Sequence, residues 1–216
     1  MKAFIFDLDG VIVDTAKYHF KSWKIIAEKF GFELSTIQNE LLKGVSREES
    51  LDIILNWGGV SIDRLDKKKY MEEKNQIYKG FINNLNQMDI LPGFNKLIGF
   101  AEIKDIPIAL GSASKNAHQI LDKLGIKNKF KVIVDGNLTK KSKPNPEVFL
   151  KGAEMLGISP KKIIVFEDSI AGIEAANKAK MISIAICTNR KIENAKFNFN
   201  SLDDISFKFF EKPEFK

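Results

Sequence analysis

The order of apolar and polar positions predicts two kinds of structure along this chain. Five short runs are almost wholly apolar, as expected of strands covered on both faces of a sheet: Ala3–Phe6, Ile106–Leu110, Lys131–Val134, Ile163–Phe166 and Ile182–Ile186. Helical patterns lie between the later runs, near Asn116–Leu124, Pro146–Leu156 and Ala171–Ala179. Because strands alternate with helices, we expect an α/β fold with a Rossmann-like parallel-sheet core.

The segment from Thr15 to Met88 follows a different pattern. Apolar side chains recur there at spacings typical of an amphipathic helix, at Ala16, Phe20, Trp23, Ala27 and Phe30. Further helical patterns cover Arg47–Trp57 and Asp63–Phe81, and no stretch between them resembles a strand. We therefore expect residues 15–88 to form an all-helical cap, inserted into a core made of residues 1–14 and 89–216.

Polar residues that can carry chemistry follow the apolar runs. Asp7, Asp9 and Gly10 come directly after the first run, and burying such charge is costly unless it is paired. GSASKN (111–116) and FED (166–168) stand at the ends of two later runs, and SKPNP (142–146) opens a helix after a loop. Ligands of parallel sheets gather at the carboxyl ends of the strands, so we expect these stretches to meet in one site.

The residue types in these stretches suit phosphoryl transfer. Carboxylates suit Mg²⁺, which prefers oxygen ligands and readily shares a phosphate. Hydroxyl and backbone N–H groups at a helix start suit an anion, and a lysine adds a positive charge for phosphoryl oxygens. Phosphoryl transfer depends mainly on positioning and charge neutralisation, which these groups supply together.

Each residue taken alone has an ordinary structural explanation. Ser112 resembles a turn or helix-capping residue, Lys143 a surface charge, and Glu167 with Asp168 a pair of strand-end acids. A calcium-binding EF-hand loop beginning at Asp7 is excluded, because it requires glycine at position 12 and glutamate at position 18. The chain has Ile12 and Tyr18 there. The order of the four stretches therefore carries the functional interpretation.

The motifs DLDGV, GSAS, SKP and FED resemble those of the haloacid dehalogenase superfamily of phosphotransferases, across essentially the whole chain. The resemblance implies a Rossmann-like core, Mg²⁺ and an aspartyl-phosphate intermediate. It implies that Asp7 is the nucleophile and Asp9 the general acid/base. It further implies phosphoryl contacts from Ser112, Ala113 and Lys143, and a metal site made of Asp7, Glu167, Asp168 and the backbone carbonyl of Asp9.

Two stretches of the predicted cap, TAKYHFKSW (15–23) and LLKGVSREES (41–50), resemble the β-phosphoglucomutase family. That family is implied to convert β-glucose 1-phosphate into glucose 6-phosphate through β-glucose 1,6-bisphosphate. The resemblance implies that the non-transferring phosphate is bound by Arg47, Ser114, Lys115 and Asn116. It implies a sugar site lined by His19, Trp23, Lys43, Gly44, Ser50 and Lys74, with Thr15 at a hinge near Asp9.

The sequence leaves alternatives open for the roles of single residues and for the function. His19 and Trp23 also suit packing within a helical bundle, and Arg47 also suits a surface pair with Glu48 or Glu49. A sugar-phosphate phosphatase would use the same core motifs. A more distant alternative is a non-catalytic module that binds anions or nucleic acid.

Composition and net charge indicate which classes of binding partner to expect. The chain has 216 residues, of which 44% are hydrophobic and 29% charged, as in soluble globular proteins. Its net charge of +6 is spread along the chain and suits a small anionic substrate such as a sugar phosphate. We expect no nucleic-acid or membrane partner, a monomer, and a cytoplasmic location. Cys187 lies in an apolar run and is expected to be an inert buried thiol.

Overall fold

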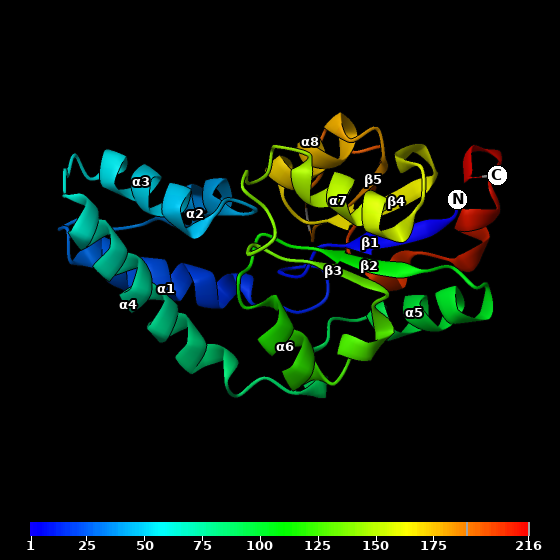
Figure 1. Ribbon diagram of the computed structural model, residues 1–216, viewed down its shortest axis with the longest axis horizontal. Coiled ribbons are helices and arrows are strands. Elements are labelled where there is room, and N and C mark those ends of the chain that lie inside the picture. Colours follow the sequence, from blue (N-terminus) through cyan, green and yellow to red (C-terminus); the bar gives the residue numbers. More distant parts are fainter. Residues whose placement is uncertain (189, 216) are drawn as a thin grey trace.

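The computed structural model describes residues 1–188 and 190–215. In these residues six parallel strands form one sheet in the order β3-β2-β1-β4-β5-β6, as Figure 1 shows. The strands are β1 (Ala3–Phe6), β2 (Ile108–Gly111), β3 (Val132–Val134), β4 (Ile163–Glu167), β5 (Ile182–Ile186) and β6 (Phe197–Phe199). The first strand of the chain thus lies between β2 and β4, where Phe6 pairs with Leu110 on one side and Phe166 on the other.

Helices cover both faces of this sheet. The core helices are α5 (Phe94–Ile103), α6 (Ala117–Leu124), α7 (Glu147–Leu156) and α8 (Ile170–Lys178). In Figure 1, α7 and α8 lie above the sheet and α5 and α6 below it. Alternate residues of β1 point to opposite faces. Phe4 and Phe6 belong to the apolar cluster on the α5–α6 side, whereas Ala3 and Ile5 belong to the cluster on the α7–α8 side.

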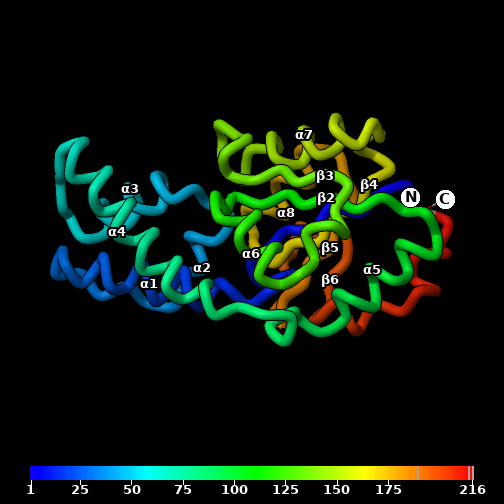
Figure 2. Tube along the Cα trace, turned by 60° about the horizontal axis from the view of Figure 1, so that its bottom comes forward, coloured from blue at the N-terminus to red at the C-terminus, as the bar shows by residue number. Residues whose placement is uncertain are grey.

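The remaining helices form a separate bundle, which stands to one side of the sheet in Figures 1 and 2. They are α1 (Ala16–Glu28), α2 (Thr36–Leu42), α3 (Arg47–Trp57) and α4 (Arg64–Ile82). The bundle buries its own apolar cluster: Trp23, Ile26, Ala27, Leu34, Leu42, Leu51, Ile54 and Leu55. The side chain of Ser46 accepts from the backbone N–H of Glu49 at the start of α3, and Asp63 caps α4 in the same way.

The predicted α/β fold is confirmed, and the differences lie in details of individual elements. The second strand begins at Ile108 and not at Ile106, while β4 extends one residue further than expected, to Glu167. The elements α2, α5 and β6 were not predicted from the apolar pattern. The helix α2 has seven residues and β6 has three, which is too short for a clear apolar period. Among the described residues, no helix is both long and apolar enough to cross a bilayer.

Candidate active site

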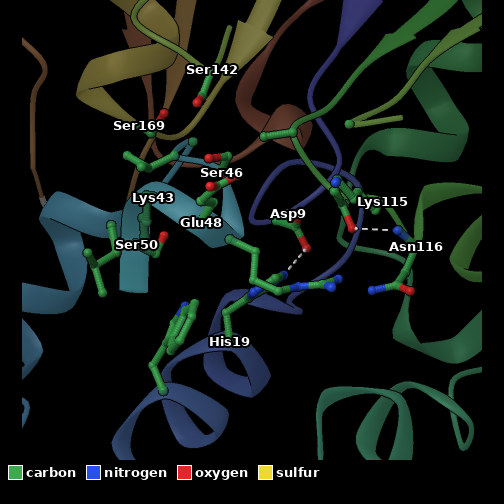
Figure 3. Close-up of a pocket in the computed structure, with 18 of the residues that line it drawn as sticks. Asp9, His19, Lys43, Ser46, Glu48, Ser50, Lys115, Asn116, Ser142 and Ser169 are labelled. Carbon is green, nitrogen blue, oxygen red and sulfur yellow. Dashed lines mark hydrogen bonds and ion pairs between the residues drawn. The ribbon is translucent and has the colours of Figure 1, made fainter. Parts of the chain in front are cut away.

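A cavity of about 330 Å³ lies where the helical bundle meets the carboxyl ends of the strands, within the usual size of a ligand pocket (Figure 3). The structure brings the predicted site residues together around it. Fifteen of them line it: Asp7, Asp9, His19, Trp23, Lys43, Gly44, Arg47, Ser50, Lys74, Ala113, Ser114, Lys115, Asn116, Glu167 and Asp168. Thr15, Ser112 and Lys143 do not line the cavity, and all three are buried.

Asp7 and Lys143 form a buried ion pair at the end of β1. Lys143 Nζ donates to Asp7 Oδ1 and, at 2.5 Å, to Glu167 Oε1. Burial and the neighbouring carboxylates of Glu167, Asp9 and Asp168 raise the pKa of Asp7, while Lys143 opposes the shift. Burial alone would lower the pKa of Lys143, but the two carboxylates outweigh it and raise that pKa. The lysine therefore stays charged beside four carboxyl groups, those of Asp7, Asp9, Glu167 and Asp168, which we call the acidic cluster.

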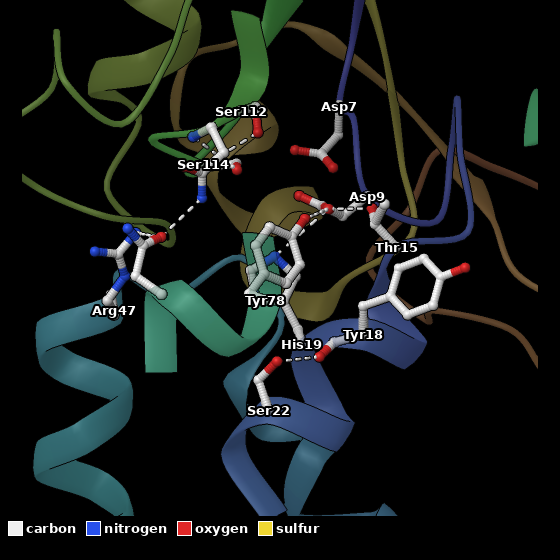
Figure 4. Close-up of polar contacts among 12 residues, drawn as sticks. Asp7, Asp9, Thr15, Tyr18, His19, Ser22, Arg47, Tyr78, Ser112 and Ser114 are labelled. Carbon is white, nitrogen blue, oxygen red and sulfur yellow. Dashed lines mark hydrogen bonds and ion pairs between the residues drawn. The ribbon is translucent and has the colours of Figure 1, made fainter. Parts of the chain in front are cut away.

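Asp9 has a different environment, although it lies only two residues further along the chain. Figure 4 shows Thr15, His19 and Tyr78 around its carboxylate. Thr15 donates to Asp9 Oδ1, and the Tyr78 hydroxyl and His19 Nε2 lie 3.5 and 3.6 Å from the same oxygen. Burial by itself raises the pKa of Asp9, but the interactions with His19 and Thr15 outweigh it and lower this pKa. Two carboxyl groups with opposite pKa shifts suit two different chemical roles.

Gly10 allows the chain to turn between these groups. Its φ is +82°, which favours glycine, and an added Cβ would lie 2.4 Å from Asp168 Oδ2. The close approach places the Asp168 carboxylate beside the loop that carries Asp9. Burial raises the pKa of Asp168 to about 7, with Glu167 adding to the shift and Lys43 opposing it.

His19 links Asp9 to a buried lysine of the bundle. Lys74 Nζ lies 2.8 Å from His19 Nδ1 and 4.9 Å from the centre of the Trp23 ring. Burial and the charge of Arg47 lower the pKa of Lys74 to about 7. Burial and Lys74 also lower the pKa of His19. A neutral His19 with its proton on Nε2 fits both contacts, because Nδ1 then accepts from Lys74 and Nε2 faces Asp9.

A second group of donors lines the cavity where α3 faces the loop after β2. Arg47 NH2 donates to Asn75 Oδ1 at 2.7 Å, and Asn116 Nδ2 donates to the same oxygen at 3.1 Å. A hydrogen bond between two serines stabilises the turn of this loop, since the Ser114 N–H donates to Ser112 Oγ at 3.0 Å. Figure 4 shows Arg47 directed from α3 toward this loop. The donors of this group come from both the bundle and the sheet domain.

The bundle also contacts the core on the side of the acidic cluster. Gly44 has a φ of +76°, and an added Cβ would lie 3.0 Å from Ser169 Oγ and 3.3 Å from Lys143 Cδ. Lys43 Nζ lies 3.1 Å from Asp168 Oδ2. An ion pair of 2.7 Å joins Glu40 of α2 to Arg190, beyond β5. The loop around Gly44 therefore lies directly over Lys143 and Asp168.

Asn75, Tyr78 and Glu40 contact predicted site residues but were not themselves predicted from the sequence. Asn75 and Tyr78 are buried on α4 together with Lys74, and they contact the cavity-lining residues Arg47 and Asp9 without lining the cavity themselves. A signal for them existed: a lysine, an asparagine and a tyrosine share the inner side of a helix. Their partners lie more than 25 positions away in the chain, and so the sequence pattern did not identify them.

The acidic cluster suits a divalent cation with oxygen ligands. Four carboxyl groups (Asp7, Asp9, Glu167 and Asp168) face only two lysine ammonium groups there, and burial together with the neighbouring carboxylates raises the pKa values of Asp7 and Asp168. Glu167 Oε2 already accepts from the N–H and hydroxyl of Ser169 at 2.8 and 2.9 Å. Within residues 1–188 and 190–215, no three Asp, Glu, His or Cys side chains converge to hold an ion unaided. Substrate and main-chain oxygens would have to complete the ligand set.

A parallel sheet with acids at the ends of β1 and β4, a buried lysine between them and a helical insertion over them defines a class of phosphate-handling enzymes. The family model described as haloacid dehalogenase-like hydrolase matches residues 4–186, and the chain belongs to this family. The resemblance seen in the sequence motifs is thereby confirmed.

Particular relatives narrow the class further. The chain is 44% identical over 188 residues to "Beta-phosphoglucomutase" of Bacillus subtilis (strain 168), which covers 86% of this chain and 83% of the relative. It is 33% identical over 183 residues to "Phosphorylated carbohydrates phosphatase" of Thermotoga maritima, and the match covers 83% of this chain and 82% of the relative. The crystal structure of β-phosphoglucomutase from Clostridium difficile superposes with a TM-score of 0.93 at 42% identity, covering 98% of this chain and 96% of that one.

Proposed function

We propose that this protein is a phosphomutase that isomerises β-glucose 1-phosphate to glucose 6-phosphate through β-glucose 1,6-bisphosphate. One observation carries the proposal: a single cavity is lined both by Asp7 with the acidic cluster and by Arg47 with Asn116. A sugar with two phosphates needs two anion-binding ends. In this proposal residues 15–88 act as a cap, and residues 1–14 and 89–216 act as the catalytic core.

Asp7 is the nucleophile in the proposed reaction. In the first half, phosphorylated Asp7 passes its phosphoryl group to the C6 hydroxyl of β-glucose 1-phosphate, and the bond between Asp7 and phosphorus breaks. Asp9 accepts the proton of that hydroxyl as general base. In the second half, Asp7 attacks the phosphorus at C1 of the bisphosphate. Asp9 then returns its proton to the leaving C1 oxygen, which releases glucose 6-phosphate and restores the phosphorylated Asp7.

Lys143, Ser112 and the Ala113 backbone surround the phosphoryl group during transfer. Lys143 neutralises charge on the phosphoryl oxygens, and it keeps Asp7 oriented through the hydrogen bond seen in the structure. We propose Mg²⁺ as the cation, held by Asp7, Asp168, Glu167 and the backbone carbonyl of Asp9. When bound, Mg²⁺ would neutralise charge on the transferring group and keep Asp7 ionised.

Asp9 keeps its orientation through three neighbours. Thr15 and Tyr78 contact Oδ1, and the N–H that we assign to His19 Nε2 faces the same oxygen. The lowered pKa of Asp9 means that it is ionised before the C6 hydroxyl arrives, as a general base must be. Lys74 keeps the accepting nitrogen of His19 away from Asp9 and so preserves this arrangement.

Arg47, Ser114, Lys115 and Asn116 bind the phosphate that is not being transferred. A guanidinium fork can hold a phosphate at two points, which suits a group that must be bound at either end of the sugar in turn. Lys43, Gly44, Ser50 and Trp23 close the cavity around the sugar ring. A closed cap excludes water, which would otherwise hydrolyse phosphorylated Asp7.

The relatives support two activities. β-Phosphoglucomutases of Bacillus subtilis and Clostridium difficile, each more than 40% identical to this chain, favour the mutase. The Thermotoga maritima phosphatase favours a second candidate, a sugar-phosphate phosphatase that uses the same nucleophile. The two activities differ in whether water or a sugar hydroxyl receives the phosphoryl group.

Product analysis separates these activities. Purified protein with Mg²⁺ and a trace of β-glucose 1,6-bisphosphate is given β-glucose 1-phosphate, and glucose 6-phosphate and inorganic phosphate are measured together. We expect glucose 6-phosphate to account for nearly all the product. Release of inorganic phosphate without glucose 6-phosphate would establish the phosphatase. Parallel assays with α-glucose 1-phosphate and mannose 1-phosphate test the anomer and the sugar.

A further inference from the structure

Asn75 joins the cap to the core at a single atom. Its side chain is 7% exposed, and Oδ1 accepts hydrogen bonds from Arg47 NH2 at 2.7 Å and from Asn116 Nδ2 at 3.1 Å. Arg47 is the first residue of α3 in the cap, whereas Asn116 precedes α6 in the core. One carboxamide oxygen therefore gathers two donors that come from opposite sides of the cavity.

The chemistry of this acceptor matters because it is neutral. In the part of the chain that the structure describes, no carboxylate forms an ion pair with the Arg47 guanidinium, whose hydrogen-bond partner is the Asn75 amide. A hydrogen bond from a guanidinium to a neutral carbonyl is weaker than one to a phosphate, which is charge-assisted. An incoming phosphate can therefore take over both donors.

We propose that Asn75 is a positioning residue for the non-transferring phosphate: its neutral carboxamide oxygen holds Arg47 and Asn116 together until a phosphate replaces it as their acceptor. The inference rests on the proposed function, which names these two residues as phosphate donors. It adds a requirement that the side chain at position 75 be an acceptor without charge.

Substitution by aspartate tests that requirement directly. Asn75→Asp keeps the size and the acceptor oxygen but adds a negative charge. The new carboxylate pairs with Arg47 in the free protein and so competes with the phosphate for this guanidinium, while the same ion pair offsets the cost of burying the charge. Damage to the structure would instead lower both ligand affinity and thermal stability. The two readouts therefore move in different directions.

Asn83 provides a matched control at the end of the same helix. Its Oδ1 accepts from Gln119 Nε2 at 2.9 Å, so it also joins cap to core, but the contact is exposed and involves neither Arg47 nor Asn116. Asn83→Asp adds the same charge to the same helix. It leaves the acceptor shared by Arg47 and Asn116 untouched.

The experiment measures binding of glucose 6-phosphate by calorimetry in the presence of Mg²⁺. We expect Asn75→Asp to raise Kd at least about tenfold while its Tm stays at or above that of the wild type. Asn83→Asp should change Kd less than about twofold, and Asn75→Ala should fall between the two aspartate variants. In an Arg47→Ala background the effect of Asn75→Asp should shrink to less than about threefold, because its main partner is gone.

Three results would overturn the role of Asn75: equal effects of the two aspartate variants, equal effects of Asn75→Ala and Asn75→Asp, or an effect that persists without Arg47. Turnover of β-glucose 1-phosphate by the wild type is measured beside binding. If the wild type binds through Arg47 and Asn75 but forms no glucose 6-phosphate, the proposed function fails and the role of Asn75 stands. If the wild type forms glucose 6-phosphate normally while Asn75→Asp binds like the wild type, the proposed function stands and the role of Asn75 fails.

Discussion

The buried lysine Lys74 gives a pH-dependent stability that can be predicted in sign and size. Its side chain is 2% exposed, and burial followed by the charge of Arg47 lowers its pKa from 10.5 to about 7. Below pH 7 the lysine is charged in both the folded and the unfolded chain, and folding carries the full cost of burying the cation. Between pH 7 and 10.5 the unfolded chain binds more protons, so the free energy of unfolding rises with pH.

The magnitude follows from the size of the pKa difference. Each pH unit between the two pKa values changes stability by about 1.4 kcal/mol, so the full span corresponds to roughly 5 kcal/mol. Lys74→Met removes the titrating group and keeps most of the apolar stem. We therefore expect the stability of the wild type relative to Lys74→Met to rise by about 2 kcal/mol from pH 7.5 to 9.

Urea unfolding at pH 7.5, 8, 8.5 and 9, without divalent ions, measures this difference. Lys69→Met is the matched control, because Lys69 lies on the same helix with an exposed side chain that meets water in both states. Its stability curve should run parallel to that of the wild type. Parallel curves for Lys74→Met as well would refute the reasoning, since they would mean that Lys74 stays charged in the folded protein.

Three further outcomes test the proposed site. Asp7→Ala should abolish the acid-stable or trapped phosphoenzyme that forms from labelled bisphosphate. If the variant still carried as much covalent label as the wild type, Asp7 would be excluded as the nucleophile. Arg47→Ala should reduce kcat/KM for β-glucose 1-phosphate roughly a hundredfold, and hydrolysis of acetyl phosphate much less, because acetyl phosphate has no second phosphate to bind; equal losses would instead assign Arg47 to the fold. Gly44→Val should lower mutase turnover at least tenfold with a small change in Tm, because its Cβ would lie 3.0 Å from Ser169 Oγ at the cap–core contact while φ is +76°; unchanged turnover would show that this contact is not needed for closure.

The acidic part of the site was predictable from sequence, because a residue that follows a strand has a known place in the sheet as well as a known side chain. In a parallel sheet the carboxyl ends of neighbouring strands meet at one edge, so acids that follow β1 and β4 must lie close together. Asp7, Asp168 and Glu167 could therefore be grouped although 160 positions separate the first from the others. The spacing of apolar residues likewise identified α1, α3 and α4.

The tertiary structure alone decided which side chains meet across the cavity. Tyr78 reaches Asp9 across 69 positions, and Asn75 reaches Asn116 across 41. A helical period tells which residues turn inward, but not which groups of another domain they face. The sequence by itself therefore determined the class of chemistry and the elements that present it. Only the packing of cap on core decided the partner of each buried polar group, because a hydrogen bond depends on distances of a few tenths of an ångström that no spacing along the chain encodes.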